Sequence, residues 1–268
     1  MSLFGRTLYL EVGAPGTQGV RIEGVKIEFD VEKTLASTPN TATIQIFNIT
    51  ESTRSAFRTE DSQVRLFAGY DQASLLFVGE PVDDGITYKP PIGDAVNDRL
   101  KVELQDGGDV LARTQVNLAY KNSVTAERVF RDVAGELGIA TGAVQLPNAT
   151  PINNGANFVG RASDVLDQLA STTGVEWSVQ NGALQALPKD QDKGVEVISL
   201  TDDTLKSTAR KKDGVEIETY LTAKIAPAER VKIDSRRIGE GLFKVRDCKY
   251  KGSLRGDTFD VTFTGREI

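Results

Sequence analysis

Residues 43–50 read TIQIFNIT, and residues 51–57 continue with ESTRSAF. In the first run the isoleucines alternate with polar residues, which is the period of a strand that buries one face. Thr50 is a suitable helix N-cap, and Glu51 suits the positive end of a helix dipole. The segment therefore predicts a half-buried strand that leads directly into one short helix.

Strand patterns surround this segment on both sides. Apolar and polar residues also alternate in three further runs, at residues 25–31, 64–66 and 100–104. Turn residues separate the runs at residues 13–19, 83–85 and 89–93. Short strands with one helix and no parallel crossover predict an antiparallel barrel or sandwich over residues 1–108.

The period changes after residues 105–109, which read QDGGD. Between residues 126 and 137 the apolar residues recur at helical spacing, and Ser123 and Gly138 are suited to cap and end this helix. A second helix is predicted to follow Ser163 and to stop at Gly174. Residues 109–190 are therefore predicted to form an inserted small α/β domain, with two helices and a hairpin.

The hairpin is predicted from Asn181-Gly182, a strong signal for a two-residue type I′ turn. A loop of this length pairs Val179 with Leu184 and Trp177 with Ala186, all on one face of the hairpin. We expect Trp177 to anchor the core of the inserted domain.

Residues 188–194 are polar and rich in turn residues, and they mark the second boundary. Strand patterns return beyond it, at residues 195–200, 215–224, 231–233, 242–250 and 259–264. Residues 191–268 are therefore predicted to form a second β domain. The two β regions could be parts of one body or two related bodies. A weak echo exists between residues 24–47 and 241–263, each of which reads as a long strand, a loop and another strand.

Composition narrows the range of functions. The 268 residues carry a net charge of −6, which argues against a dedicated nucleic-acid binder, because such a protein needs surplus lysine and arginine. The chain has no histidine, which removes histidine-based general bases, catalytic triads and most zinc sites. The one cysteine, Cys248, is expected to be a small buried residue. No run approaches 18 apolar residues, so no membrane span is predicted.

Several motifs have a plain explanation beside a functional one. Gly13-x-x-Gly16-x-x-Gly19 resembles a phosphate loop but is better explained as a hairpin loop. Asp83-Asp84-Gly85 and Asp202-Asp203 lack the spacing of a calcium loop and fit turns. The basic clusters Arg210-Lys211-Lys212 and Arg236-Arg237 fit solvated faces or subunit contacts. No catalytic, cofactor-binding or metal-binding residue is predicted, no cofactor is expected, and the protein is not expected to be an enzyme.

The order of these elements resembles one family. The strand of residues 43–50 and its short helix look like the opening of phage tail tube and hub proteins. Residues 123–129, the second helix and the Trp177 hairpin are similar to the inserted α/β region of baseplate hub proteins. Residues 231–245 look like the second barrel of that family, which includes the hubs of contractile-tailed phages and late control protein D. The resemblance covers nearly the whole chain as pattern and order, and no motif in it is diagnostic alone.

The resemblance implies a fold and a role. It implies an α+β, mainly β chain, with two tail-tube-like antiparallel β-barrel domains at residues 1–108 and 191–268. Three copies would form a homotrimeric hub that adapts a sixfold tail tube to a threefold central spike and lines the DNA channel. Partners would be the tail tube or distal tail protein above and the spike below, with the tape measure protein and baseplate wedge as further candidates. The location would be the virion, assembled in the bacterial host cytoplasm, with no membrane and no sequence-specific nucleic acid bound.

Other functions stay open at this point. A distal tail protein or the spike base of a secretion system would share the structural role. A carbohydrate-binding module would need exposed aromatic residues on one sheet. A histidine-free hydrolase would need a deep pocket with two suitably spaced carboxyl groups.

Overall fold

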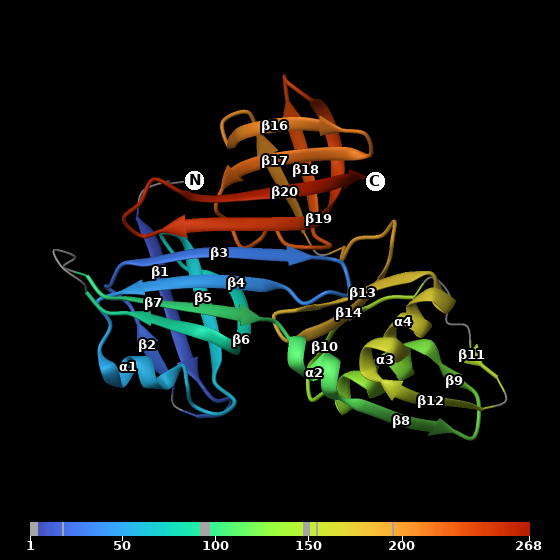
Figure 1. Cartoon of the computed structure of the whole chain (residues 1–268). Coiled ribbons are helices and arrows are strands. Elements are labelled where there is room, and N and C mark those ends of the chain that lie inside the picture. The colour runs from blue at the N-terminus through green and yellow to red at the C-terminus, as the bar shows by residue number, and fades with distance from the viewer. Residues whose placement is uncertain (1–4, 18, 92–96, 147–150, 154, 195) are drawn as a thin grey trace.

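The computed structural model describes residues 5–17, 19–91, 97–146, 151–153, 155–194 and 196–268. Of these residues, 55% lie in strands and 14% in helices, so the predicted mainly β class is confirmed. Two β regions lie next to each other, and a smaller segment with most of the helices lies at one side (Figure 1).

The first β region contains seven strands and one helix. Their bounds are β1 Arg6–Gly13, β2 Val20–Ile22, β3 Ile27–Thr34, β4 Thr41–Phe47, α1 Glu51–Ala56, β5 Gln63–Tyr70, β6 Ser74–Lys89 and β7 Arg99–Gln105. The predicted half-buried strand is β4, in which Ile44 and Ile46 are fully buried. Thr50 is the N-cap of α1, and its hydroxyl accepts a hydrogen bond from the Thr53 amide, as the sequence predicts.

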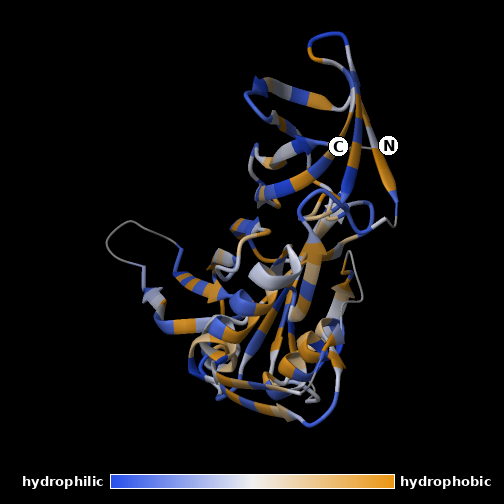
Figure 2. Ribbon diagram, turned by 90° about the vertical axis from the view of Figure 1, so that its right-hand side faces the viewer, coloured by the Kyte–Doolittle hydropathy of each residue, from blue (hydrophilic) through white to orange (hydrophobic). Residues whose placement is uncertain are grey.

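The second β region contains six strands. Their bounds are β15 Val197–Thr201, β16 Leu205–Lys211, β17 Gly214–Tyr220, β18 Arg230–Ser235, β19 Gly239–Ser253 and β20 Phe259–Glu267. Together the two regions form one 13-stranded sheet, in the order β16-β17-β20-β19-β3-β4-β7-β6-β5-β1-β2, with β18 and β15 branching from β19. Hydrophilic and hydrophobic residues alternate along these strands (Figure 2).

Each region bends its strands into two layers. In the first region β1 and β5 cross over β3, β4 and β7 (Figure 1). No closed barrel is detected among the described residues, so the predicted barrels are present only as bent, open sheets. The pairing is antiparallel throughout this sheet except for β15, which pairs parallel with β18.

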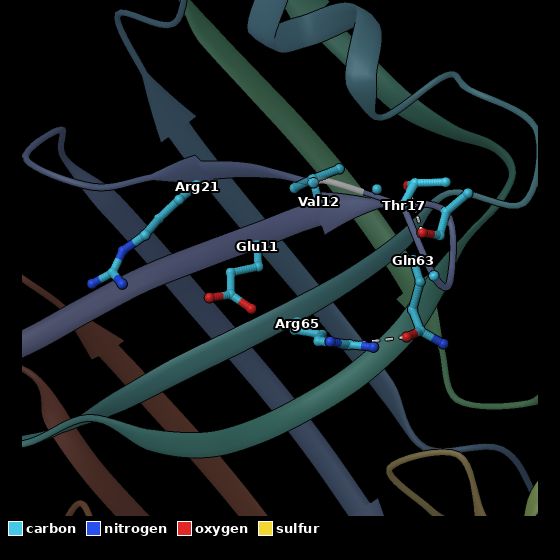
Figure 3. Close-up of a pocket in the computed structure, with 10 residues that line it drawn as sticks. Glu11, Val12, Thr17, Arg21, Gln63 and Arg65 are labelled. Carbon is cyan, nitrogen blue, oxygen red and sulfur yellow. Dashed lines mark hydrogen bonds between the residues drawn. The ribbon is translucent and has the colours of Figure 1, made fainter.

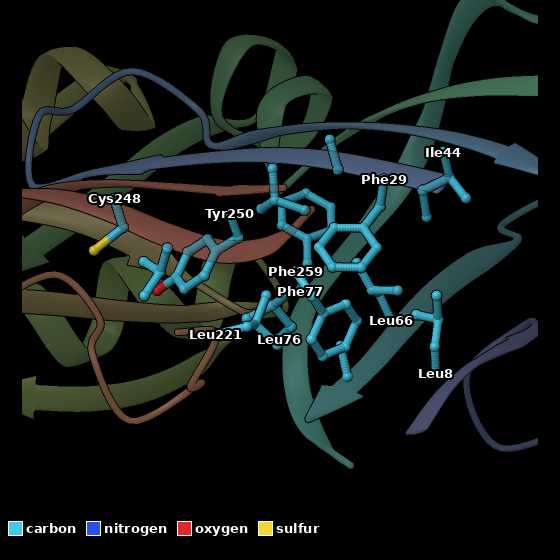
Figure 4. Packing of buried hydrophobic residues seen from close by; sticks show 14 of the residues in the cluster. Leu8, Phe29, Ile44, Leu66, Leu76, Phe77, Leu221, Cys248, Tyr250 and Phe259 are labelled. Atoms are coloured by element: carbon cyan, nitrogen blue, oxygen red, sulfur yellow. The ribbon is translucent and has the colours of Figure 1, made fainter. Parts of the chain in front are cut away.

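The core between the layers is shared by both regions. Apolar residues of the two regions form one continuous buried cluster. Phe29 from β3 meets Phe259 from β20 edge to face, with ring centroids 6.1 Å apart, and Tyr250 lies beside them (Figure 4). Because aromatic burial of this kind contributes several kcal/mol in total, we expect the two regions to unfold together.

The segment between the β regions has its own core. Its elements are α2 Gly108–Arg113, β8 Gln115–Tyr120, β9 Val124–Thr125, α3 Ala126–Glu136, β10 Ala140–Val144, β11 Pro151–Ile152, β12 Ala156–Arg161, α4 Ala162–Thr173, β13 Val175–Gln180 and β14 Ala183–Pro188. A separate buried cluster joins α3 and α4 to the hairpin β13–β14. Trp177 is 4% exposed in this cluster, and its indole N–H donates to Asp167 at 2.7 Å.

The hairpin prediction is confirmed in detail. Asn181 and Gly182 both have positive φ angles, 53° and 76°, as a type I′ turn requires. Val179 pairs with Leu184 and Trp177 with Ala186.

Other local predictions need correction. The first long helix is capped by Thr125 and not by Ser123, because the short strand β9 intervenes. The second helix begins one residue before Ser163 and ends at Gly174 as predicted. Asp83-Asp84-Gly85 is no turn: it lies inside β6, as an irregularity where pairing with β7 breaks between Pro81 and Ile86. The predicted turn at residues 89–93 lies partly outside the described residues.

Candidate assembly surface

The two β regions repeat one strand arrangement. The path β3-β4-β7-β6-β5-β1 in the first region corresponds to β16-β17-β20-β19-β18-β15 in the second, and the chain visits corresponding strands in the same order. The last strands differ in direction, because β1 pairs antiparallel with β5 whereas β15 pairs parallel with β18. The echo seen in the sequence matched β3 and β4 with β19 and β20, and that match is wrong. In the structure β3 and β4 correspond to β16 and β17.

A ladder of hydrogen bonds joins the two regions. The last part of β19 pairs antiparallel with β3, from Asp247 opposite Thr34 to Ser253 opposite Glu28. The two paired segments are more than 200 residues apart in the sequence. Figure 1 shows β19 directly alongside β3.

One face of this ladder is polar. Lys251 forms an ion pair with Asp30 at 3.0 Å, and Lys249 forms one with Glu32 across the same two strands. The Thr34 hydroxyl donates to the Asp247 carboxylate at 2.7 Å. Bonding to Glu32 raises the pKa of the Lys249 ammonium, so this lysine stays charged at neutral pH.

The opposite face of the ladder is buried. Val31 and Tyr250 are fully buried there, and the Tyr250 hydroxyl donates to the Ile225 carbonyl. Burial raises the pKa of the Tyr250 hydroxyl well above its usual value. Cys248 lies on the same side, as predicted, and burial raises the pKa of its thiol to about 12. A thiol of this kind is poorly suited to nucleophilic chemistry.

The polar face extends over eight neighbouring strands, from β16 to β6. The pairing registers place acidic side chains on it at Glu28, Asp30, Glu32, Glu103, Glu216, Glu218 and Asp247. The same registers place basic side chains on it at Arg99, Lys101, Lys211, Lys249 and Lys251. Glu80, Asp260 and Lys89 also lie on this face. Among its charged residues, the polar face of β3 carries acids only, at Glu28, Asp30 and Glu32, and the lysines of β19 lie beside them.

Two edges of this surface have no partner strand in the described chain. β16 pairs only with β17, which leaves its outer edge open. β6 pairs with β5 through residues 74–79 only, so the β5 side of residues 82–89 is also open. Open edges present unpaired backbone N–H and C=O groups and favour pairing with another chain.

Charged groups of opposite sign lie at these two edges. A cavity of about 940 Å³ at the end of β16 is lined by five cations, Arg210, Lys211, Lys212, Arg246 and Arg266, and by two acids, Asp213 and Glu267. Next to the open edge of β6 lie Asp83, whose side chain is 90% exposed, and Asp84, which has a φ angle of 57°.

The inserted segment is fastened to the β regions by buried polar groups. The Asp106 carboxylate accepts hydrogen bonds from the Asn181 and Gly182 amides at 2.6 and 2.8 Å. Lys33, 4% exposed, donates to the Asn181 side chain at 2.7 Å, and burial lowers the pKa of this lysine to about 8. Burial likewise raises the pKa of Asp106. The hairpin turn is thus held against the first β region.

The remaining motifs from the sequence have structural roles. Residues 13–19 connect β1 to β2, and beside them lies a cavity of about 290 Å³ lined by Glu11, Arg21, Gln63 and Arg65 (Figure 3). Asp202 accepts a hydrogen bond from the Ser235 hydroxyl at 2.6 Å, which lowers the pKa of this carboxyl and fixes a loop. Arg236 lies 3.7 Å from the same carboxylate.

The described part of the chain offers no group of three or more histidine, cysteine, aspartate or glutamate side chains placed to hold a metal ion. No helix within those residues is long and apolar enough to cross a membrane.

Sequence reasoning did not identify the open strand edges. β16 has few apolar residues, and Arg210-Lys211-Lys212 is recognisable in the sequence only as a basic cluster. The position of this cluster at the end of an edge strand depends on the sheet topology.

Comparison with known proteins identifies structures with a similar fold. No protein-family model and no curated protein matches this chain. A tail protein from Neisseria meningitidis MC58 is similar in structure, with a TM-score of 0.67, 9% identity and coverage of 98% of this chain and 97% of that one. The 43 kDa tail protein of prophage MuSo2 from Shewanella oneidensis is also similar in structure, with a TM-score of 0.65 and 10% identity. The alignment covers 97% of this chain and 98% of that one.

A third similar structure comes from outside phages. A component of the Escherichia coli type VI secretion system, described as structurally similar to the T4 bacteriophage tail proteins gp27 and gp5, gives a TM-score of 0.65 at 14% identity. The alignment covers 96% of this chain and 76% of that one. The chain therefore has the fold shared by phage tail proteins and a type VI secretion component.

Proposed function

We propose that this protein is a structural subunit of a phage tail baseplate, a homotrimeric hub that joins a sixfold tail tube to a threefold central spike. The observation that carries the proposal is the repeat of one strand arrangement in two β regions joined by β19 and β3. Three copies would present six equivalent β regions, which suits a sixfold neighbour on one side. The chain itself would repeat only three times, which suits a threefold neighbour on the other.

The proposal assigns a role to each unit. Residues 1–108 and 191–268 would be the two tube-like units of the ring, each completed as a barrel wall by its neighbours. Residues 109–190 would lie outside the ring and contact further baseplate proteins. The tail tube or distal tail protein, the spike, the tape measure protein and the baseplate wedge are the candidate partners, in a virion assembled in the host cytoplasm.

The polar sheet face would line the channel through the ring. DNA binding needs clustered lysine and arginine to neutralise successive phosphates. On this face each strand that carries lysines also lies beside acids, as at Lys251 and Asp30. Passing DNA would find no continuous basic track to hold it, and no reacting group is required for this role.

Mass measurement by light scattering, followed by cryo-electron microscopy, tests the proposal. We expect a particle of three chains with a central channel and an inner wall of near-sixfold symmetry. A ring of six chains would favour a distal tail protein instead.

A secretion-system spike base is the second candidate function, because a type VI secretion component shares the fold. It would also be threefold, so symmetry does not separate it from the hub. Binding to a phage tail tube protein, measured by pull-down of the purified pair, would separate the two.

A further inference from the structure

We propose that the inserted segment binds an extended peptide of a neighbouring tail protein. The peptide adds as a strand to the free edge of β12 and places uncharged, apolar side chains in the groove between β12 and α4. This inference rests on the proposed function in one respect, because that function places the inserted segment outside the ring, where another tail protein can reach it.

The groove is a cavity of about 590 Å³ in the inserted segment. It lies between β12 and the second half of α4, and Ile152 of β11 and Ala126 at the start of α3 also line it. Its volume lies in the range of known ligand pockets, so it has room for a few side chains. Figure 1 shows β12 and β11 at the margin of the molecule, away from the two β regions.

The edge of β12 along the groove is unpaired. Among the described residues β12 pairs with β8 alone. Ala156, Asn157 and Phe158 are successive residues of β12, and all three line the groove. Because successive side chains point to opposite faces of a strand, a cavity lined by three in a row runs along the edge of the strand. The groove therefore gives access to backbone N–H and C=O groups with which a further strand can pair.

The opposite wall is one face of a helix. Gln168, Leu169, Thr172 and Thr173 of α4 line the groove at helical spacing. The Thr172 and Thr173 hydroxyls donate to the Gln168 and Leu169 carbonyls at 2.8 and 2.7 Å, which leaves their methyl groups for a partner. A free strand edge beside a groove that takes alternate side chains is the arrangement used in peptide recognition by strand addition.

The lining selects the chemistry of the peptide. The described residues that line the groove are all uncharged, and Phe158, Leu169 and Ile152 give it apolar surface. A charged side chain would lose its water there without a partner of opposite charge. The exposed side-chain amides of Asn157 and Gln168 have no partner within the described chain, so they are free to bind the peptide backbone. We therefore expect small or apolar residues at alternate positions of the peptide.

An exposed apolar residue lies on the same strand. Val159 is 73% exposed, more than any other large apolar residue of the described chain. A single exposed apolar residue is ordinary, but this one directly follows Phe158 along the free edge of β12. A strand added to β12 would place a side chain beside Val159 and cover part of it.

Hydrogen exchange with a peptide pool tests the strand addition. The probe is a pool of acetylated, amidated octapeptides with threonine at alternate positions and alanine, valine, leucine, isoleucine or phenylalanine at the others, added at millimolar concentration to the full chain. We expect slower exchange at alternate amides of residues 156–160, because the outward N–H groups become hydrogen-bonded. A control pool with proline at the central positions lacks those backbone donors and should leave exchange unchanged. Unchanged exchange with both pools, or equal slowing by both, would overturn the proposal.

A charge placed in the groove gives a second readout. Ser171 and Thr172 are exposed neighbours on α4, but of these two only Thr172 lines the groove. Thr172→Lys should weaken binding of the tightest pool member roughly tenfold, measured by fluorescence anisotropy of the labelled peptide. Ser171→Lys is the matched control and should change binding less than about twofold. Equal weakening by both variants, or none by Thr172→Lys, would show that the peptide binds elsewhere and would overturn the proposal.

The outcomes separate this inference from the proposed function. The peptide assays report on the inserted segment whether or not the chain forms a ring. If light scattering finds the ring and the peptide assays fail, the groove proposal fails and the hub proposal stands. If the chain stays monomeric but the peptide binds and Thr172→Lys weakens it, the hub proposal fails and the peptide site stands.

Discussion

The Lys244 ammonium lies 2.7 Å from the Glu176 carboxylate, and this ion pair joins β19 to the hairpin of the inserted segment. Lys244 is 1% exposed, and it also donates to the Pro188 carbonyl at 3.0 Å. A lysine in such a place is held by its partners, because an unpaired buried charge is costly. The pair therefore fixes where the inserted segment sits against the second β region.

Removing one partner of this pair should be costly. We expect Lys244→Met to lower the free energy of unfolding by about 1–3 kcal/mol, because the partly buried Glu176 carboxylate keeps only Arg246, at 3.7 Å, and the Pro188 carbonyl loses this donor. Urea denaturation followed by tryptophan fluorescence measures this, since Trp177 lies on the same hairpin strand. The double variant Lys244→Met with Glu176→Leu should lose clearly less than Lys244→Met alone. Equal losses would mean that the charge pair is not the cause.

Lys33 should make stability depend on pH. Its pKa is lowered by burial to about 8, whereas an unfolded chain keeps the usual value of 10.5. Between these values the unfolded state binds more protons, so the free energy of unfolding contributed by Lys33 rises with pH from about 8 to about 10.5. Lys33→Met should lack this rise. Denaturation of both chains at pH 7, 8, 9 and 10 gives the difference in their free energies of unfolding at each pH. A difference that does not change with pH would contradict the prediction.

Local features of this fold could be predicted from the sequence because their causes are local. The Asn181-Gly182 turn needs two positive φ angles, and those two residues tolerate them. The cap at Thr50 similarly depends on one hydroxyl and an amide three residues later. The buried tryptophan followed from the register that the turn imposes.

The assembly surface could not be predicted in the same way. Asp83-Asp84-Gly85 has the composition of a turn, but its neighbours on both sides pair with the same strand, β7, so the chain absorbs the extra residues inside β6. β16 lacks a strong apolar period because none of its residues is fully buried and its outer edge is open. The β19–β3 ladder depends on contacts over more than 200 residues, which no local pattern records.

Tyr250 tests how far the shared core depends on a single polar contact. Tyr250→Phe keeps the ring beside Phe29 and Phe259 but leaves the buried Ile225 carbonyl without this donor. We expect a loss of about 1–2 kcal/mol in the free energy of unfolding. Tyr250→Ala should lose about 3–5 kcal/mol, because a cavity is added. If the two variants lose the same amount, the ring's packing contributes nothing beyond the hydroxyl.

Asp106 provides the most specific test of how the inserted segment is held. Its two carboxylate oxygens accept from the Asn181 and Gly182 amides, and Asp106→Asn replaces one acceptor with a donor that faces an N–H group. We expect a loss of about 1–3 kcal/mol, together with faster hydrogen exchange at the amides of residues 181 and 182. Asp190→Asn, an exposed change at the end of the same hairpin, is the matched control and should leave exchange at the turn unchanged. Unaltered exchange in Asp106→Asn would show that the turn is held by its own type I′ geometry and not by the first β region.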